Sequence, residues 1–383
     1  MTGIYPISRR QPICIVVGLD FHVKSKSVYC IMDKETGEVI AKGKFESNYE
    51  GFKKALGKIL KENPKTEVGL ENGTGSYKWA NIIQDSGGIA RVYSADEVSS
   101  KSRSQRKKCD YRDAEDLCNN MRGGVLTKEI RLPPLKIKYL RSQLKLREMY
   151  VRQGVQVQNN TRCIVREYGI KEEFRSLNEE KGWEILLSEK MPKVVKEMIE
   201  INHRQFIEIK KRLEELEKEI SKYDRELKEF EILRSIPGFG DVSTRTMKAL
   251  IFDINRFESG KKLVSYLGLS PSSYDSGERV RHGRITKEGN KLGRKVLIEV
   301  AQKSSMKWHP LNRVYRRYVV KKGHNKAVVA IAAKLCRIMY RMLKNKEEFS
   351  VGKLLIKEPV TKKNAYLVND VSVKTEGKAV KEG

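Results

Sequence analysis

Short apolar runs separated by turn residues occupy the first hundred residues, a pattern typical of a mixed sheet with helices. The run at 13–20 (ICIVVGLD) is rich in β-branched residues and predicts a buried strand. Strands are predicted at 13–20, 27–33, 39–47, 67–71 and 89–93, and helices at 48–60 and 77–85. A further helix follows the last strand. This order of elements predicts an α/β domain.

Acidic residues end two of these strands. Asp20 ends the first strand and Glu71 the fourth, and Asp110 and Asp113 share one face of the last helix because they are three residues apart. The four carboxylates, once gathered, repel one another unless divalent cations neutralise them. Oxygen ligands favour Mg²⁺ or Mn²⁺ over zinc. The pattern predicts a metal site for phosphodiester chemistry, although any single acid in a chain that is 33% charged is also an ordinary surface residue.

Long charged helices are predicted in the middle of the chain, at 135–168 and 192–233, after the stop Pro133-Pro134. Apolar residues of the second helix alternate steps of three and four, which is typical of a coiled-coil seam. The seam consists of Phe206, Ile209, Leu213, Leu216, Ile220, Tyr223, Leu227 and Phe230. A hairpin with the first long helix and a coil between subunits both satisfy this pattern.

The segment 233–240 (LRSIPGFG) is similar to a helix-hairpin-helix turn. In such a turn, glycines such as Gly238 and Gly240 let backbone amides approach a DNA phosphate; a plain packing hairpin is the alternative. Helices are predicted at 291–303 and 326–344, and the basic, tyrosine-bearing stretch 314–322 between them favours a nucleic-acid surface. The polar tail, 346–383, is predicted to be disordered.

The net charge of the chain indicates which class of partner it binds. A net charge of +29 over 383 residues predicts a polyanion, and nucleic acid is expected rather than a membrane because no apolar run approaches the roughly 18 residues of a membrane span and no signal pattern begins the chain. We expect a cytoplasmic, nucleoid-associated protein. Six dispersed cysteines argue against disulfides and a zinc site. Candidate nucleic-acid contacts before the acid pair are Lys101, Arg103, Arg106, Lys107 and Lys108.

Three stretches, GLD ending at Asp20, LENG around Glu71 and KCDYRDA at 108–114, resemble the D, E and DxxDA motifs of the RuvC-like domain of DEDD transposases, the RNA-guided insertion-sequence family one-ten. Residues 263–290, with Tyr274-Asp275-Ser276-Gly277, look like the transposase domain of the same family. The resemblance covers about residues 10–345. Phe21-His22-Val23 is a loose version of the family's histidine-bearing turn.

The resemblance implies a fold in three parts and a tail. These are a RuvC-like (ribonuclease-H-like) mixed-sheet domain at 10–125, a long-helix coiled-coil region at 133–232, a mainly helical transposase domain at 233–345 and the tail at 346–383. It further implies a coiled coil that dimerises, a homo-oligomer built as a dimer that assembles into a tetramer, and active sites that pair one subunit's carboxylates with another's serine.

The resemblance also implies a mechanism. Asp20, Glu71, Asp110 and Asp113 would hold Mg²⁺ or Mn²⁺, and Ser276 would attack DNA. A serine hydroxyl is a weak nucleophile, so nearby cations are needed to stabilise the developing charge. The candidates are Arg279, Arg281, Arg284 and Lys287. Judged from residues alone, Ser270, Ser272 and Ser273 compete with Ser276.

The partners implied are the DNA of the element ends and of the target, and a non-coding guide (bridge) RNA that selects the DNA by base pairing. Two other functions fit parts of the chain: a metal-dependent nuclease of the Holliday-junction type, and a non-enzymatic RNA or DNA binder. The intact set of four acids counts against the binder, and the carboxyl-terminal region counts against the nuclease. Without a Walker motif, rejoining has to conserve the phosphodiester energy, through a serine–DNA adduct or direct transesterification.

Overall fold

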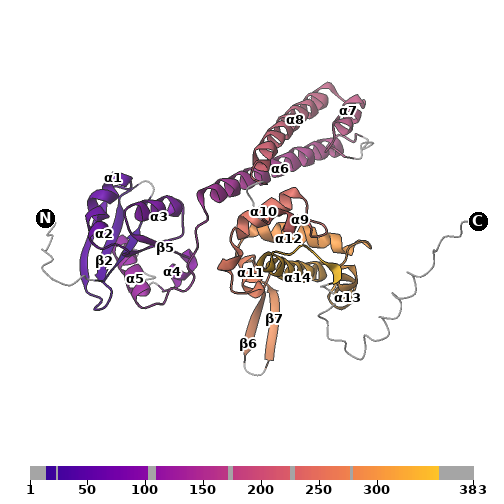
Figure 1. Ribbon diagram of the computed structural model, residues 1–383. Helices are drawn as coiled ribbons and strands as arrows, with labels where there is room; N and C mark the ends of the chain where they lie inside the picture. Colours follow the sequence, from indigo (N-terminus) through magenta and orange to yellow (C-terminus); the bar gives the residue numbers. More distant parts are fainter. Residues whose placement is uncertain are drawn as a thin grey trace, which may run out of the picture. The chain divides into compact units, whose positions relative to one another are not determined.

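The computed structural model describes residues 14–22, 25–101, 109–170, 176–224, 229–276 and 279–352, with the side chains of residue 101, 273–276 and 279–282 left out of the description. It divides into two compact units, Met1–Pro133 and Pro134–Gly383 (Figure 1). Of the tail predicted to be disordered, residues 353–383 lie outside the described residues.

A five-stranded mixed sheet forms the first unit. Its strands are β1 (Ile15–Asp20), β2 (Ser27–Asp33), β3 (Val39–Phe45), β4 (Glu67–Glu71) and β5 (Ile89–Tyr93), in the order β3-β2-β1-β4-β5. β1 pairs antiparallel with β2 and parallel with β4, β2 pairs antiparallel with β3, and β4 pairs parallel with β5. All five predicted strands are confirmed to within two residues. The topology is of the ribonuclease-H-like type.

Helices cover both faces of this sheet. The elements between the strands are α1 (Tyr49–Phe52), the π-helical turn η1 (Lys53–Gly57), α2 (Lys58–Glu62) and α3 (Ser76–Asp85), and α4 (Ala95–Lys101) and α5 (Asp110–Arg122) follow the last strand. Because side chains alternate along a strand, Val17 and Leu19 of β1 pack with residues of α1, α2 and α3, whereas Val16 packs with α5. Asn48 caps α1 as predicted, accepting a hydrogen bond from the Gly51 amide at 2.8 Å.

Two glycines bring α5 unusually close to the sheet. Gly18 of β1 and Gly69 of β4 are register partners. A Cβ atom at Gly18 would lie 2.1 Å from the carbonyl oxygen of Ala114, and one at Gly69 would lie 2.0 Å from Sδ of Met121. At Gly18 the backbone of α5 occupies the place of a side chain, whereas at Gly69 the flexible end of the Met121 side chain does. The contact between Ala114 and Gly18 thus holds the first half of α5 against β1.

A helical hairpin opens the second unit. It consists of α6 (Leu135–Glu167), α7 (Glu180–Ser188) and α8 (Lys193–Ser221), and α6 and α8 run antiparallel (Figure 1). Val157, Trp183 and Phe206 belong to the cluster that joins the three helices. The amino-terminal half of the predicted seam is therefore packed within one chain, against the first long helix.

The prediction of a continuous helix to residue 233 is wrong. α8 ends at Ser221, and after a turn the short helix α9 (Phe230–Arg234) follows. Two ion pairs join the described residues on either side of this break to α10, the next long helix: Asp224 with Arg245 at 2.5 Å, and Glu229 with Lys248. The heptad pattern of the sequence continues to Phe230, but Tyr223 and Phe230 pack beside Ala249 and Leu140 instead of extending a coil.

The rest of the second unit is mainly helical. Its elements are α10 (Asp241–Ile251), the 3₁₀ turn η3 (Ile254–Arg256), α11 (Gly260–Tyr266), α12 (Lys291–Gln302), the 3₁₀ turn η4 (Lys303–Ser305), α13 (Asn312–Lys322) and α14 (His324–Asn345). α14 supplies the centre of the core. An antiparallel ribbon of β6 (Pro271–Ser276) and β7 (Arg279–Ile285) projects beside α11 (Figure 1). Among the described residues, no helix is long and apolar enough to cross a membrane.

Candidate active site

Two of the predicted acids end neighbouring strands on one face of the sheet. Asp20 has the same alternation as Val16 and Gly18, so its side chain belongs to the face that α5 covers. Glu71 follows Gly69 with the same alternation. Because β1 and β4 are parallel, with Leu19 opposite Leu70, both acids stand at the same edge of the sheet.

The other two acids lie in the first turn of α5, above that edge. Asp110 is the first residue of the helix, and Asp113 follows one turn later. Carboxylates at a helix amino terminus are stabilised by the helix dipole. The next residue, Ala114, is completely buried, with its carbonyl oxygen against Gly18. Ala114 therefore lies where the backbone of α5 touches β1, and this close approach depends on the glycine at position 18.

Asp20, His22 and Asp110 form a compact group in which one possible ligand atom from each lies within 4.8 Å of the others. Nε2 of His22 is 3.5 Å from Oδ2 of Asp20 and 3.7 Å from Oδ2 of Asp110. This nitrogen is buried and makes no hydrogen bond to any described residue. Two carboxylates and a buried imidazole nitrogen without a hydrogen bond suit a divalent cation.

Glu71 and Asp113 are not members of this group among the described residues. Glu71 is exposed at the end of β4, and Asp113 is half-buried in α5. The structure therefore gathers two of the four predicted acids and adds His22, to which the prediction gave no role. The available signal was a histidine two residues after a strand-ending acid, since residues two apart in an extended chain point to the same side.

The basic segment before α5 lies largely outside the described residues. This holds for Arg103, Arg106, Lys107 and Lys108 and for the side chain of Lys101, which ends α4. Their assignment to nucleic acid stays a prediction.

Ser276 is the last residue of β6, and its register partner across the ribbon is Arg279. The side chains of Ser276, Arg279 and Arg281 are outside the description. Arg284 and Lys287, at the base of the ribbon, are both exposed. The predicted serine and three of its cations, Arg279, Arg281 and Arg284, thus belong to a β-ribbon, and Lys287 follows it.

Glycines also fix the base of this ribbon. Gly268 (φ +64°) and Gly289 (φ +106°) take left-handed conformations. A Cβ at Gly268 would lie 2.2 Å from the Glu288 carbonyl oxygen, and one at Gly289 would lie 2.3 Å from that of Tyr266. The chain segments before and after the ribbon therefore touch backbone to backbone.

The turn at 235–240 joins α9 to α10 as predicted. Gly238 has a φ of +94°, and Nζ of Lys303 donates to its carbonyl at 2.9 Å. The Gly240 amide donates to Oγ of Ser243 at 2.7 Å, so this amide is already taken within the protein. Phe239 anchors the turn in the core. Any phosphate contact here has to use other groups than the Gly240 amide.

An exposed basic surface lies beside that turn. His309 contacts the Pro237 carbonyl at 3.1 Å, and its neighbour Trp308 is 61% exposed. No Asp or Glu occurs between Glu299 and Glu347. Of the two tyrosines in the predicted nucleic-acid surface at 314–322, Tyr315 is buried and its hydroxyl lies 2.7 Å from Nδ1 of His324, whereas Tyr318 is half-buried.

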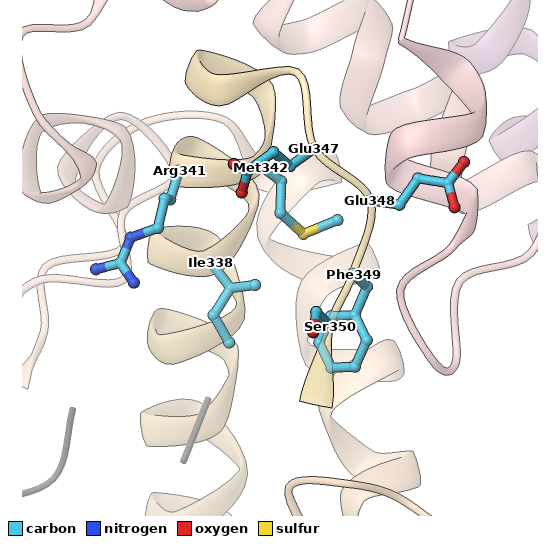
Figure 2. Close-up of a pocket in the computed structure, with 7 residues that line it drawn as sticks. All are labelled: Ile338, Arg341, Met342, Glu347, Glu348, Phe349 and Ser350. Atoms are coloured by element: carbon cyan, nitrogen blue, oxygen red, sulfur yellow. The ribbon is translucent and has the colours of Figure 1, made fainter. Parts of the chain in front are cut away.

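A pocket at the carboxyl end of α14 contains none of the predicted site residues. Figure 2 shows it between the last turns of the helix and the segment that follows. Its lining comprises Ile338, Arg341, Met342, Glu347, Glu348, Phe349 and Ser350. Four of these seven side chains are polar or charged, but none of them is a candidate site residue, so we assign this pocket no part in the candidate site.

Two family models match the chain. One, described as "Transposase IS116/IS110/IS902 family", matches residues 230–318, and the other, a model of DEDD transposases described as "Transposase", matches residues 17–170. The first match covers the ribbon that contains Ser276, and the second covers the sheet with its acids.

Individual relatives extend this likeness. The transposase for insertion sequence element IS1328 of Yersinia enterocolitica is 21% identical over 335 residues, which are 86% of this chain and 97% of that protein. The transposase for element IS1111A of Coxiella burnetii is 24% identical over 222 residues, 55% of this chain and 59% of the other. The pilin gene-inverting protein of Moraxella lacunata is 30% identical over 121 residues, 31% of this chain and 38% of the other.

Proposed function

Because the chain is a DNA transposase of the IS110 family, we propose that it cuts and rejoins DNA strands with a divalent-metal carboxylate site and a serine–DNA intermediate, directed by a guide RNA. The observation that carries the proposal is the Asp20–His22–Asp110 group, seated by the paired strands β1 and β4 under the amino terminus of α5.

Asp20 and Asp110 would hold the cation, Mg²⁺ or Mn²⁺, with Glu71 and Asp113 at the same edge completing the oxygen ligands. When bound, such an ion polarises a phosphoryl oxygen and stabilises the charge that develops on it. Asp20→Asn and Asp110→Asn should abolish strand cleavage while DNA binding is retained, and chelation should do the same reversibly. Asp96→Asn, at an exposed position of α4, is the control. Full activity of Asp110→Asn would remove this helix from the site.

Ser276 would be the nucleophile. Its Oγ forms a bond to phosphorus as the bond to one strand oxygen breaks, that oxygen takes up a proton, and attack by a strand hydroxyl later reverses the step. Ser276→Ala should lose the SDS-stable protein–DNA adduct yet still bind DNA. Ser272→Ala is the matched control, because the Ser272 hydroxyl donates to the Arg284 carbonyl at 2.9 Å within the ribbon. Adducts that persist in Ser276→Ala and vanish in Ser273→Ala would reassign the nucleophile.

The adduct also separates this function from its main competitor. A metal-dependent nuclease of the Holliday-junction type needs only the first unit and would cut DNA without becoming attached to it. Cleavage that depends on Asp110 but never yields an adduct would favour the nuclease.

A surface for nucleic acid is supported in the second unit by Trp308 and the acid-free stretch around it. An exposed indole among cations suits base stacking, which contributes about 1–3 kcal/mol per base. Trp308→Ala should therefore weaken binding of a single-stranded oligonucleotide about tenfold. Val320→Ala, an 88% exposed apolar position on α13, should leave binding unchanged. Equal affinities for both variants would exclude stacking at Trp308.

Guidance by RNA is supported by charge. A protein with a net charge of +29 has ample capacity for phosphates, and sequence choice can be delegated to a base-pairing guide. One discrete, element-encoded RNA should co-purify, and altering its target-pairing segment should redirect insertion. Site-specific recombination by RNA-free protein would refute the guide. With DNA as its substrate, the protein would act in the cytoplasm, at the nucleoid.

Oligomerisation would use a second stripe of α8. Leu216 packs in the cluster with Leu140 and Leu144 of α6, and Leu213 is half-buried. In contrast, Val194, Met198 and Ile201, spaced by four and three residues, are 66%, 38% and 56% exposed. We propose that a dimer forms through this stripe and assembles into a tetramer. Met198→Lys with Ile201→Glu should lower the mass in light scattering and the activity together. An unchanged mass would exclude this stripe.

Shared active sites follow from the same proposal and have their own test. If one subunit's carboxylates act with another's serine, mixing the inactive variants Asp110→Asn and Ser276→Ala should restore adduct formation to roughly a quarter of the wild-type level, because half of randomly formed dimers are mixed and half of their sites are intact. No recovery after verified subunit exchange would place both groups in one subunit.

A further inference from the structure

The histidine in the Asp20–His22–Asp110 group has no part in the four-acid mechanism. We propose that His22 is a direct ligand of the cation, so that the site is a mixed nitrogen and oxygen site with a preference for Mn²⁺ over Mg²⁺. This rests on the proposed function, in which Asp20 and Asp110 hold the metal.

The backbone holds His22 in place for this role. Asp20 pairs with Val28 at the last register position of β1 and β2, and His22 stands two residues further. Its amide donates to Oγ of Ser27 at 3.1 Å, and that hydroxyl lies 2.7 Å from Oγ of Ser47. Ser27 is completely buried. A buried polar anchor therefore fixes the start of the turn and keeps the imidazole beside Asp20.

The distances suit ligation better than hydrogen bonding. At 3.5 and 3.7 Å from the two carboxylate oxygens, Nε2 is too far for a hydrogen bond, for which about 2.7–3.2 Å is usual. Metal–ligand bonds of about 2.1 Å place neighbouring ligand atoms about 3.0 Å apart and opposite ones about 4.2 Å apart. The three atoms, all within 4.8 Å of one another, are spaced like ligands around a common centre.

A nitrogen ligand changes which ion the site selects. Mg²⁺ is a hard cation that prefers oxygen and holds its waters, whereas Mn²⁺ and later first-row ions accept imidazole. Replacing His22 by aspartate would convert the group to oxygen ligands only. The ratio of Mn²⁺ to Mg²⁺ affinity should then fall by about tenfold.

The test is Mn²⁺ binding to the full chain without nucleic acid, followed by electron paramagnetic resonance. Pulsed spectra of the wild type should contain the ¹⁴N coupling of a directly bound imidazole. His22→Gln should lose this coupling, and His22→Asp should keep a bound Mn²⁺ without it. His203→Gln is the control, since His203 stacks on Trp183 in the second unit and should leave the spectrum unchanged. Circular dichroism confirms that each variant is folded.

The outcomes test the histidine ligand and the carboxylate site separately. Mn²⁺ that binds in an Asp110-dependent way but shows no ¹⁴N coupling, or a coupling that survives in His22→Gln, overturns the role of His22 and leaves the carboxylate site standing. A wild-type protein that takes up no Mn²⁺, or takes it up equally well as Asp110→Asn, overturns the carboxylate site and the histidine ligand with it.

Discussion

Replacing Gly18 with alanine should separate the two halves of the carboxylate site. The new Cβ would lie 2.1 Å from the carbonyl oxygen of Ala114 and 3.1 Å from Sγ of Cys118. A carbon–oxygen contact needs about 3.3 Å, so α5 has to move outward by about 1 Å. The obstacle is backbone in the middle of a helix, and no side-chain rotation can relieve it. Asp110, four residues before Ala114, moves with the helix away from Asp20.

Two magnitudes follow from this displacement. Overpacking of a core contact costs about 1–3 kcal/mol of stability. A displacement of about 1 Å in a catalytic group costs about a hundredfold in rate. We therefore expect Gly18→Ala to fold, to lose a moderate part of its stability and to cut DNA about a hundredfold more slowly.

Gly69→Ala is the matched control because Gly69 is the register partner of Gly18 on the neighbouring strand. There the new Cβ would meet Sδ of Met121 at 2.0 Å. A methionine side chain is flexible and can swing aside while the helix backbone stays in place. This variant should lose less than about 1 kcal/mol and keep activity within a few-fold of the wild type.

Hydrogen exchange with mass spectrometry on the full chain measures the stability of the first unit separately, through peptides of β1, β4 and α5. Strand cleavage with saturating Mn²⁺ measures the displacement at the site. If Gly18→Ala and Gly69→Ala behave alike in both assays, or if Gly18→Ala cuts at the wild-type rate, the glycine seat does not position Asp110.

Three further predictions concern stability. The hydrogen bond from Lys34 lowers the pKa of the Glu67 carboxyl group in the folded protein. The stabilisation by this carboxylate is therefore complete above the pKa of the unfolded state, and it disappears as the pH falls through the lower pKa of the folded state. Glu67→Gln should accordingly melt at a lower temperature than the wild type at pH 7 and at the same temperature at pH 2. Arg141→Met should cost about 1 kcal/mol in urea unfolding because the buried Ala249 carbonyl loses the guanidinium that donates to it, while the Leu250 carbonyl still accepts from Arg256 and Tyr266. Arg152→Met on the exposed face should cost less than about 0.5 kcal/mol. Gly154→Ala should stabilise the α6–α8 hairpin by about 0.5–1 kcal/mol, because its Cβ would make only ordinary contacts at 3.8 Å; a destabilised variant would contradict this.

The sheet could be predicted from the sequence because its signals are local. A run of β-branched apolar residues is typical of a buried strand, and the polar residues that end β1 and β4 show where each run stops. Two acids at such stops, followed by a pair in helical spacing, were sufficient to locate Asp20 and Asp110 near each other. Which carboxylates share an ion was not predictable, since that depends on distances of a few ångströms between segments remote in the sequence.

Long-range contacts explain the elements that were predicted wrongly. The apolar pattern of α8 continues to Phe230, but the helix ends where Asp224 and Glu229 pair with Arg245 and Lys248 of α10. The spacing of apolar residues along a helix gives no information about ion-pair partners that lie about twenty residues away in the sequence. Tyr315 was misplaced for a similar reason: the alternation of basic and aromatic residues fits a nucleic-acid surface, yet its hydroxyl bonds to His324 at the start of α14.

The two functional segments are held in place by the same physical device. In the first unit, Gly18 lets the backbone of α5 approach β1, and the first turn of α5 then brings Asp110 close to Asp20. In the second, Gly268 and Gly289 let the two ends of the ribbon segment meet backbone to backbone, and Ser276 stands at the far end of its strand. A glycine weakens a strand or a turn by its conformational freedom, so these glycines lower the stability of the fold. In return, they allow backbone contacts closer than any side chain permits, and these contacts fix the positions of site residues that are remote in the sequence.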